Sequence, residues 1–149
     1  MSTRGYVILG CCVGALVLIQ AIPYGHDHSD PPTVAEPHWD SAQTRALFQR
    51  ACFDCHSNNT VWPWYSKVAP MSWLVENDVE GGRRHMNLSE WNRPQKDAAN
   101  VANKVRSGDM PLWYYLPMHP RARLSAAAKQ ELIAGAARSL GPQTPPRRH

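Results

Sequence analysis

Three residues at fixed spacing carry the clearest chemistry in this chain: Cys52, Cys55 and His56, in the run Cys-Phe-Asp-Cys-His. Two thiols at this separation can reach the two vinyl groups on one edge of a porphyrin. The imidazole that follows can then face the iron from the proximal side, and a short helical turn satisfies both demands. The spacing is therefore typical of covalent, c-type haem attachment.

Other chemistries use the same residue types. A structural zinc site needs four ligands, often two such cysteine pairs, so His85, His119 or a carboxylate would have to complete it. A thioredoxin-like dithiol would need a βαβ context, and the sequence has no such pattern. A chance match is the remaining alternative. Export from the cytoplasm would favour haem, because the thioether bonds are formed outside it.

The second axial ligand is a separate question, and Met110 is the leading candidate. It opens a proline-held, irregular stretch after a helix, in the run Gly-Asp-Met-Pro-Leu over residues 108–112. Such a stretch can present a side chain to a metal, although methionine also serves as core filler. Met118, His119, His85 and Met86 are rivals, and an open sixth position is a further alternative.

Aromatic residues are frequent, with six tryptophans and five tyrosines. Trp62, Trp64 and Trp73 follow the cysteine motif closely. We expect these three to wall the porphyrin and lower the local dielectric, although ordinary core packing would use the same residue types.

The N-terminus is apolar from Tyr6 to Ile22 apart from Gln20. This length is near the lower limit of about 17–25 residues for a membrane-spanning helix. A small-x-small cleavage site is missing, and the apolar run continues past Cys11, unlike a lipoprotein signal. An uncleaved signal anchor fits best. Arg4 precedes the run, which predicts a cytoplasmic N-terminus and a domain outside the cytoplasm.

Four segments follow from this pattern: an anchor over residues 1–24, a proline-rich linker over 25–37, a haem-binding domain over 38–141 and a basic Pro/Arg tail over 142–149. His26 and His28 fall in the linker, where we expect them in solvent. The formal net charge is +4, but the basic residues form no stripe, which argues against a nucleic-acid partner. Cys11 and Cys12 lie in the apolar run, so no disulfide framework is expected.

Helical signals fill the predicted domain. A helix capped by Asp40 or Ser41 runs to about Cys52, and another runs from Met71 to about Met86, broken or frayed near Gly81-Gly82. A third begins at Pro94 and ends at Gly108, and a last one runs from Ser125 to Leu140. Residues 109–123 read as irregular. Alternating strand patterns are absent, so the predicted class is all-α.

Several strings of this sequence together resemble the small bacterial haem-binding domain proteins, which are related to the cytochromes c. They include Ile-Pro-Tyr-Gly at 22–25, Ala-Cys-Phe-Asp-Cys-His-Ser-Asn at 51–58, Trp-Pro-Trp-Tyr-Ser at 62–66, Gly-Asp-Met-Pro at 108–111 and His-Pro at 119–120. The resemblance implies a cytochrome c-like helical domain around one haem c, with iron ligated by His56 and Met110. Met118 departs from the pattern, where an aliphatic residue is expected.

We expect a mono-haem electron carrier rather than an enzyme, since His/Met ligation leaves no site for substrate. It would be anchored in the bacterial inner membrane, with its haem domain in the periplasm and periplasmic redox proteins as partners. A sensor of diatomic gases with a displaceable Met110 is the alternative. Peroxidase-like chemistry would need a polar distal group, for which His85 and His119 are candidates.

Overall fold

Residues 2–141 are described by the computed structural model, and they form helices joined by irregular segments without any strand. An isolated parallel bridge joins Ala35 to Glu90. The prediction of an all-α chain is therefore confirmed for this range. The predicted basic tail, residues 142–149, lies outside the described residues.

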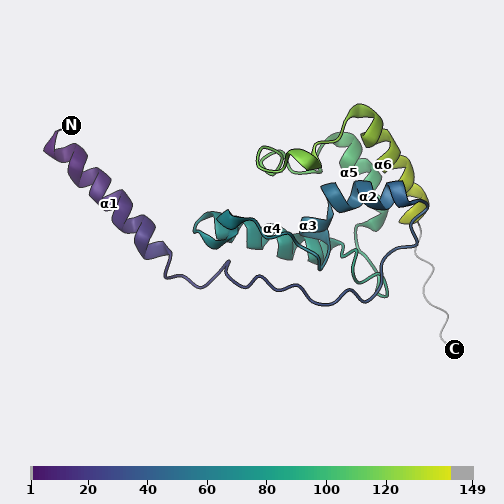
Figure 1. Ribbon diagram of the computed structural model, residues 1–149, viewed down its shortest axis with the longest axis horizontal. Helices are drawn as coiled ribbons and strands as arrows, with labels where there is room; N and C mark the ends of the chain where they lie inside the picture. Colours follow the sequence, from purple (N-terminus) through teal and green to yellow (C-terminus); the bar gives the residue numbers. More distant parts are fainter. Residues whose placement is uncertain (1, 142–149) are drawn as a thin grey trace. The chain divides into compact units, whose positions relative to one another are not determined.

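The helices differ widely in length (Figure 1). The α-helices are α1 (Thr3–Ile19), α2 (Ala42–Ala51), α3 (Phe53–His56), α4 (Met71–His85), α5 (Val101–Ser107) and α6 (Ala126–Ser139), and the 3-10 helices are η1 (Trp64–Lys67), η2 (Ala98–Asn100) and η3 (Pro120–Ala122). The chain divides into two compact units, Met1–Ser29 with Trp62–Asp78 and Asp30–Val61 with Val79–His149.

The first unit contains α1, whose described side chains include none that is buried. Within the described range, no helix combines the length and apolarity that crossing a membrane requires. After α1, the Gln20 side chain accepts a hydrogen bond from the Ala69 N–H at 2.9 Å and donates one to the Ala69 carbonyl at 3.0 Å. Gly25 has φ +83°, and a Cβ there would lie 2.6 Å from the Ser72 carbonyl carbon, so this approach requires glycine.

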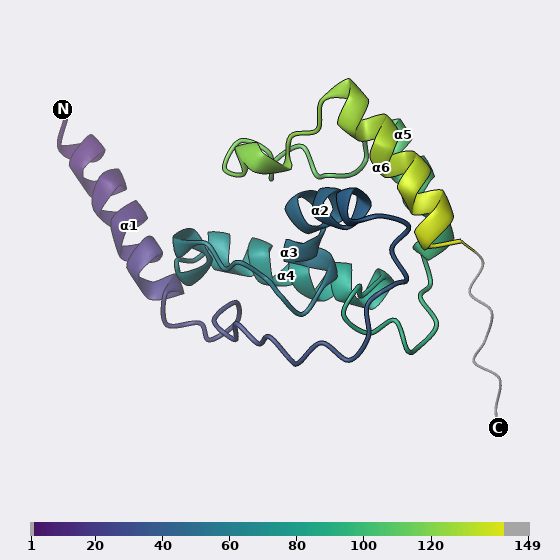
Figure 2. The ribbon, with the colours of Figure 1, turned by 45° about the vertical axis from the view of Figure 1, so that its right-hand side comes forward.

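The second unit is built on α2, α5 and α6, which lie close together in Figures 1 and 2. Their apolar faces share one core with the segment after α4, made of Leu47, Phe48, Phe53, Met86, Leu88, Ala98, Val105, Leu132, Ile133, Ala136 and Leu140. Gly135 on α6 allows close approach to α2, because a Cβ there would lie 2.5 Å from the Thr44 Cγ2. This core supports the helical turn that carries the cysteine motif.

Three predicted helix ends are confirmed. Ser41 caps α2 by accepting a hydrogen bond from the Thr44 N–H, and Ser125 caps α6 by accepting one from the Ala128 N–H. Gly108 ends α5 with φ +85°, the left-handed conformation that glycine adopts without strain.

Two predicted helix features are wrong. α4 runs without a break through Gly81-Gly82. The third helix begins at Val101, after the η2 turn, and not at Pro94. The reason is that Gln95 is held by side-chain bonds, accepting from the Asn87 N–H at 2.8 Å and donating to the Glu90 carbonyl at 2.7 Å. These bonds keep residues after Pro94 in an irregular path.

Candidate functional site

The cysteine motif occupies a tight junction between two helices. Cys52 ends α2 and immediately precedes α3, the single turn Phe53–His56. The His56 N–H donates to the Cys52 carbonyl at 2.9 Å, which closes the turn. Phe53 is buried in the core and fixes its orientation. The short helical turn expected from the spacing is therefore present, with the Cys55 and His56 side chains half-buried.

His56 is oriented by main-chain carbonyls from α4 and its C-terminal end. Its Nδ1 lies 3.0 Å from the Gly82 carbonyl oxygen and 3.1 Å from that of Met86. A carbonyl only accepts, so Nδ1 carries the proton and the neutral ring keeps its lone pair on Nε2. Burial lowers the pKa of His56, and the two carbonyl bonds offset this only in part. The arrangement leaves the lone pair of Nε2 available to a metal ion.

Gly82 is the contact point between α4 and the motif. A Cβ on Gly82 would overlap the Cys55 carbonyl oxygen and lie 2.8 Å from its carbonyl carbon. The neighbouring Gly81 has no such contact, since the nearest atom to its Cβ would be Arg84 Nη2 at 3.9 Å. The Gly81-Gly82 pair by itself predicts a helix break, which the structure does not have. A glycine inside a helical pattern also signals close packing, and that signal applies to Gly82.

The two thiols do not form a disulfide, and Cys52 and Cys55 are both half-buried. Burial raises the pKa of the Cys52 thiol to about 12, with a smaller contribution from Cys55. Dithiol oxidoreductases instead use a lowered thiol pKa, so this environment argues against the redox alternative. Among the described residues, no three His, Cys, Asp or Glu side chains gather into a metal-binding cluster.

A long-range hydrogen bond ties the segment that carries Met110 to the motif. The Tyr115 hydroxyl donates to Asp54 Oδ2 at 2.5 Å, across 61 positions of sequence. Asp54 lies between the two cysteines. Tyr115 also stacks on His119, with ring centroids 3.8 Å apart. This bond links the irregular segment to the cysteine turn, and no local sequence pattern indicated it.

Met110 itself is half-buried and lies two residues after Gly108, the left-handed end of α5. Its N–H donates to the Lys104 carbonyl at 3.2 Å, which holds the backbone at the start of the loop. The rival ligands have other surroundings. Met118 is 58% exposed and Met86 is buried in the core, while His85 Nδ1 lies 2.7 Å from Asp97.

The three predicted wall tryptophans all belong to the first unit. Trp62 stacks on His28, with ring centroids 4.3 Å apart, and Trp64 is 74% exposed. Trp73 is half-buried, and its indole Nε1 has no hydrogen-bond partner in the described part of the chain. His28 is expected in solvent from the sequence, but its Nε2 lies 3.0 Å from the Ser66 carbonyl oxygen, in addition to its stacking on Trp62. The role of the tryptophans around a haem stays a prediction.

The donor set fits a haem group, because one turn presents two thiols and an imidazole whose Nε2 is free of the bonds that orient the ring. Comparison with models of known families gives a match to the haem-binding domain over residues 14–138, most of the chain. No curated protein and no solved structure matches the chain.

Proposed function

The chain belongs to the haem-binding domain family, and from this premise we propose that it is a mono-haem, c-type electron-transfer protein with His56 and Met110 as axial ligands. One observation carries the proposal. Two backbone carbonyls hold the Nδ1–H of His56, so its Nε2 is left to bind iron beside the half-buried thiols of Cys52 and Cys55.

Each residue of the motif has a distinct part in this proposal. Cys52 and Cys55 would hold the porphyrin edge through thioether bonds, and the bound iron would supply the one-electron couple. His56 would ligate the iron in one fixed orientation, because both carbonyls that accept its proton belong to the backbone. Hydrogen bonding at Nδ1 also increases the basicity of the ligating nitrogen. Such rigid ligation favours electron transfer over substrate chemistry.

Met110 is proposed as the distal ligand because its segment is linked to the motif by the Tyr115–Asp54 bond. Three of its rivals are less suited, while His119, whose Nδ1 lies 3.0 Å from the Tyr115 carbonyl oxygen, stays an alternative within the same segment. Met118 is largely in solvent and Met86 packs in the core, while the His85 ring lies against Asp97. A thioether ligand raises the reduction potential relative to a second histidine.

The proposed location is the periplasmic face of the bacterial inner membrane, with α1 within the anchor. Support comes from the apolar, unburied side chains of α1 and from Arg4 ahead of them. Thioether formation outside the cytoplasm agrees with export. Partners would be periplasmic redox proteins that meet the domain through a small, transient interface.

The test is the optical spectrum of the purified protein, oxidised and reduced, with and without carbon monoxide. A c-type reduced spectrum, a weak methionine–iron band in the oxidised form and only slow binding of carbon monoxide would support electron transfer. A rapid spectral shift with carbon monoxide would instead favour a gas sensor with a labile sixth ligand.

The Met110→Ala variant tests the distal assignment, with Met118→Ala as the matched control. Met110→Ala should remove the methionine–iron band, lower the reduction potential and open the sixth position to carbon monoxide. Met118→Ala should leave all three unchanged, because that side chain is mostly exposed. An unchanged spectrum in Met110→Ala would remove Met110 from the proposed role.

A further inference from the structure

A cationic pocket lies in the second unit. Two of its lining residues, Arg83 and Asn87, come directly after the residues whose carbonyls hold His56. Its volume is about 370 Å³. The lining contains one acidic side chain, Glu90, and four basic side chains, Arg83, Arg84, Arg93 and Lys96. No function assigned above uses this pocket. An excess of positive charge around a concave surface raises the local concentration of anions.

Several of these cations have donor groups to spare. Arg93 uses its Nε to bond Glu90 at 2.6 Å, and within residues 2–141 its terminal nitrogens have no partner. Lys96 is exposed, and it too lacks a partner among the residues described. Arg84 forms an exposed pair with Glu80 at 3.5 Å, and such i,i+4 pairs contribute little. Three side chains can therefore turn toward an anion.

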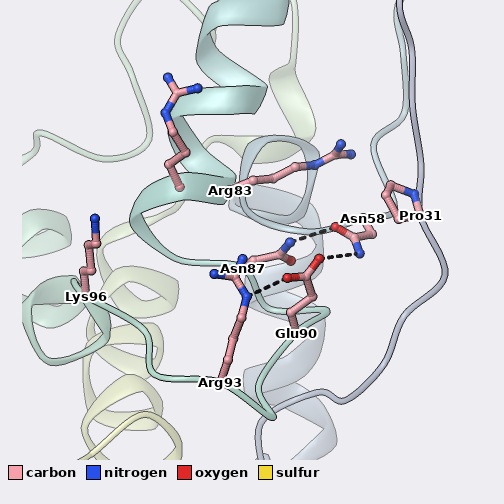
Figure 3. Close-up of a pocket in the computed structure, with 8 residues that line it drawn as sticks. Pro31, Asn58, Arg83, Asn87, Glu90, Arg93 and Lys96 are labelled. Carbon is pink, nitrogen blue, oxygen red and sulfur yellow. Dashed lines mark hydrogen bonds and ion pairs between the residues drawn. The ribbon is translucent and has the colours of Figure 1, made fainter.

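The acidic residue of the pocket is already engaged on both oxygens. Glu90 Oε1 accepts from the Asn58 amide at 3.3 Å and Oε2 accepts from Arg93. Asn87 donates in turn to Asn58 at 2.8 Å. Figure 3 shows these residues joined in one chain of hydrogen bonds, with Lys96 standing outside it. Glu90 therefore offsets Arg93, and the charge of Arg84 and Lys96 is left for a ligand.

The pocket is directly connected to the support of His56. Arg83 follows Gly82 and Asn87 follows Met86, and the carbonyls of Gly82 and Met86 are the two that accept the His56 proton. In addition, the Leu88 N–H donates to the His56 carbonyl at 2.7 Å. A charge bound in the pocket would therefore act on the backbone that orients the proximal histidine.

We propose that this pocket binds a small phosphate- or carboxylate-bearing anion, and that the bound anion favours the oxidised state of the His56 site. The physical basis of the coupling is that negative charge stabilises the more positive of two redox states. By linkage, the oxidised protein must then bind the anion more tightly than the reduced protein. The coupling rests on the function proposed above, whereas anion binding does not.

The first experiment titrates the full-length protein with inorganic phosphate by calorimetry, at constant ionic strength set with chloride. The double variant Arg84→Gln/Lys96→Gln should lower phosphate affinity about tenfold, equivalent to about 1.4 kcal/mol. Its matched control is Lys67→Gln/Arg121→Gln, which removes the same charge from exposed positions outside the pocket lining and should bind like the wild type. Absence of saturable binding, or equal loss in both double variants, would overturn the anion site.

The second experiment measures the midpoint potential with and without saturating phosphate. The midpoint potential should fall when phosphate is added. The size of the fall should correspond to about fivefold tighter phosphate binding by the oxidised protein than by the reduced protein. An unchanged potential despite phosphate binding would overturn the coupling. A protein without covalent haem would contradict the proposed function instead, while the calorimetric titration would still decide the anion site. Competition by a soluble short-chain phosphatidylglycerol that exceeds that of phosphate would identify a lipid headgroup as the source of the anion.

Discussion

His56 depends for its orientation on backbone atoms rather than on a neighbouring carboxylate. Its Nδ1 lies within hydrogen-bond distance of two carbonyl oxygens, those of Gly82 and Met86. Carbonyls carry no titratable proton, so this support does not weaken as surrounding carboxylates protonate. A substitution of the Met86 side chain would keep the carbonyl that accepts the His56 proton. The orientation of His56 should therefore be most sensitive to substitutions that shift the backbone at Gly82 or Met86.

The Tyr115–Asp54 bond gives a prediction at the scale of one hydroxyl group. Tyr115→Phe keeps the ring that stacks on His119 and removes the donor to Asp54. A hydrogen bond to a charged group contributes about 1.5–3 kcal/mol, so the loop that carries Met110 should open more often. We expect carbon monoxide to bind the reduced protein about tenfold faster or more, measured by stopped-flow absorbance.

The control for this variant is Tyr6→Phe, which makes the same chemical change at an exposed position of α1. Its carbon monoxide binding rate should stay near that of the wild type. Equal rates in the two variants would show that the Tyr115 hydroxyl does not hold the distal loop.

Residues whose role depends on adjacent sequence could be predicted, and residues that act across the fold could not. The chemistry proposed for Cys52, Cys55 and His56 follows from their spacing in the sequence. Asp54 and Tyr115 are 61 positions apart, and each is unremarkable in its own surroundings. Only the folded chain pairs them.

At the scale of helices, the same distinction separates the predictions that were confirmed from those that were wrong. The caps of α2 and α6 and the end of α5 depend on one residue each, and the sequence indicates all three, with Asp40 or Ser41 as the two candidates for the cap of α2. The start of α5 depends on Gln95, whose side chain bonds residues five to eight positions earlier. The preference of proline for the first turn of a helix, which placed the predicted start at Pro94, does not reveal these side-chain bonds of Gln95.

Gly82 gives a prediction about how α4 meets the cysteine turn. Gly82→Ala places a methyl group against the Cys55 carbonyl, a backbone group that cannot rotate away. Overpacking of this kind costs about 1–3 kcal/mol, so the free energy of unfolding should fall by that amount. Urea unfolding followed by circular dichroism measures it.

Gly81→Ala is the matched control, since its added methyl group has space. Replacing glycine in a helix interior by alanine stabilises by about 0.8–1 kcal/mol, so this variant should unfold at a higher urea concentration than the wild type. If both variants shift the midpoint in the same direction, the close approach of Gly82 to Cys55 does not limit packing.

For the whole molecule, the class and the motif could be predicted, while the surroundings of the site could not. The absence of alternating strand patterns was enough to predict an all-α chain. The cationic pocket draws on Pro31, Asn58 and residues from 83 to 96, and no short pattern links them. His28 and Trp62 likewise meet across 34 positions, which placed a linker histidine against an aromatic ring instead of in solvent.

One covalently attached haem is central to the proposed function, and intact mass spectrometry under denaturing conditions tests for it most directly. The protein from cells competent for c-type haem attachment should carry the added mass of one haem, which denaturation cannot remove. The Cys52→Ala/Cys55→Ala variant should show the mass of the polypeptide alone. A wild-type mass without haem, or an attached haem that survives loss of both cysteines, would contradict the proposed function.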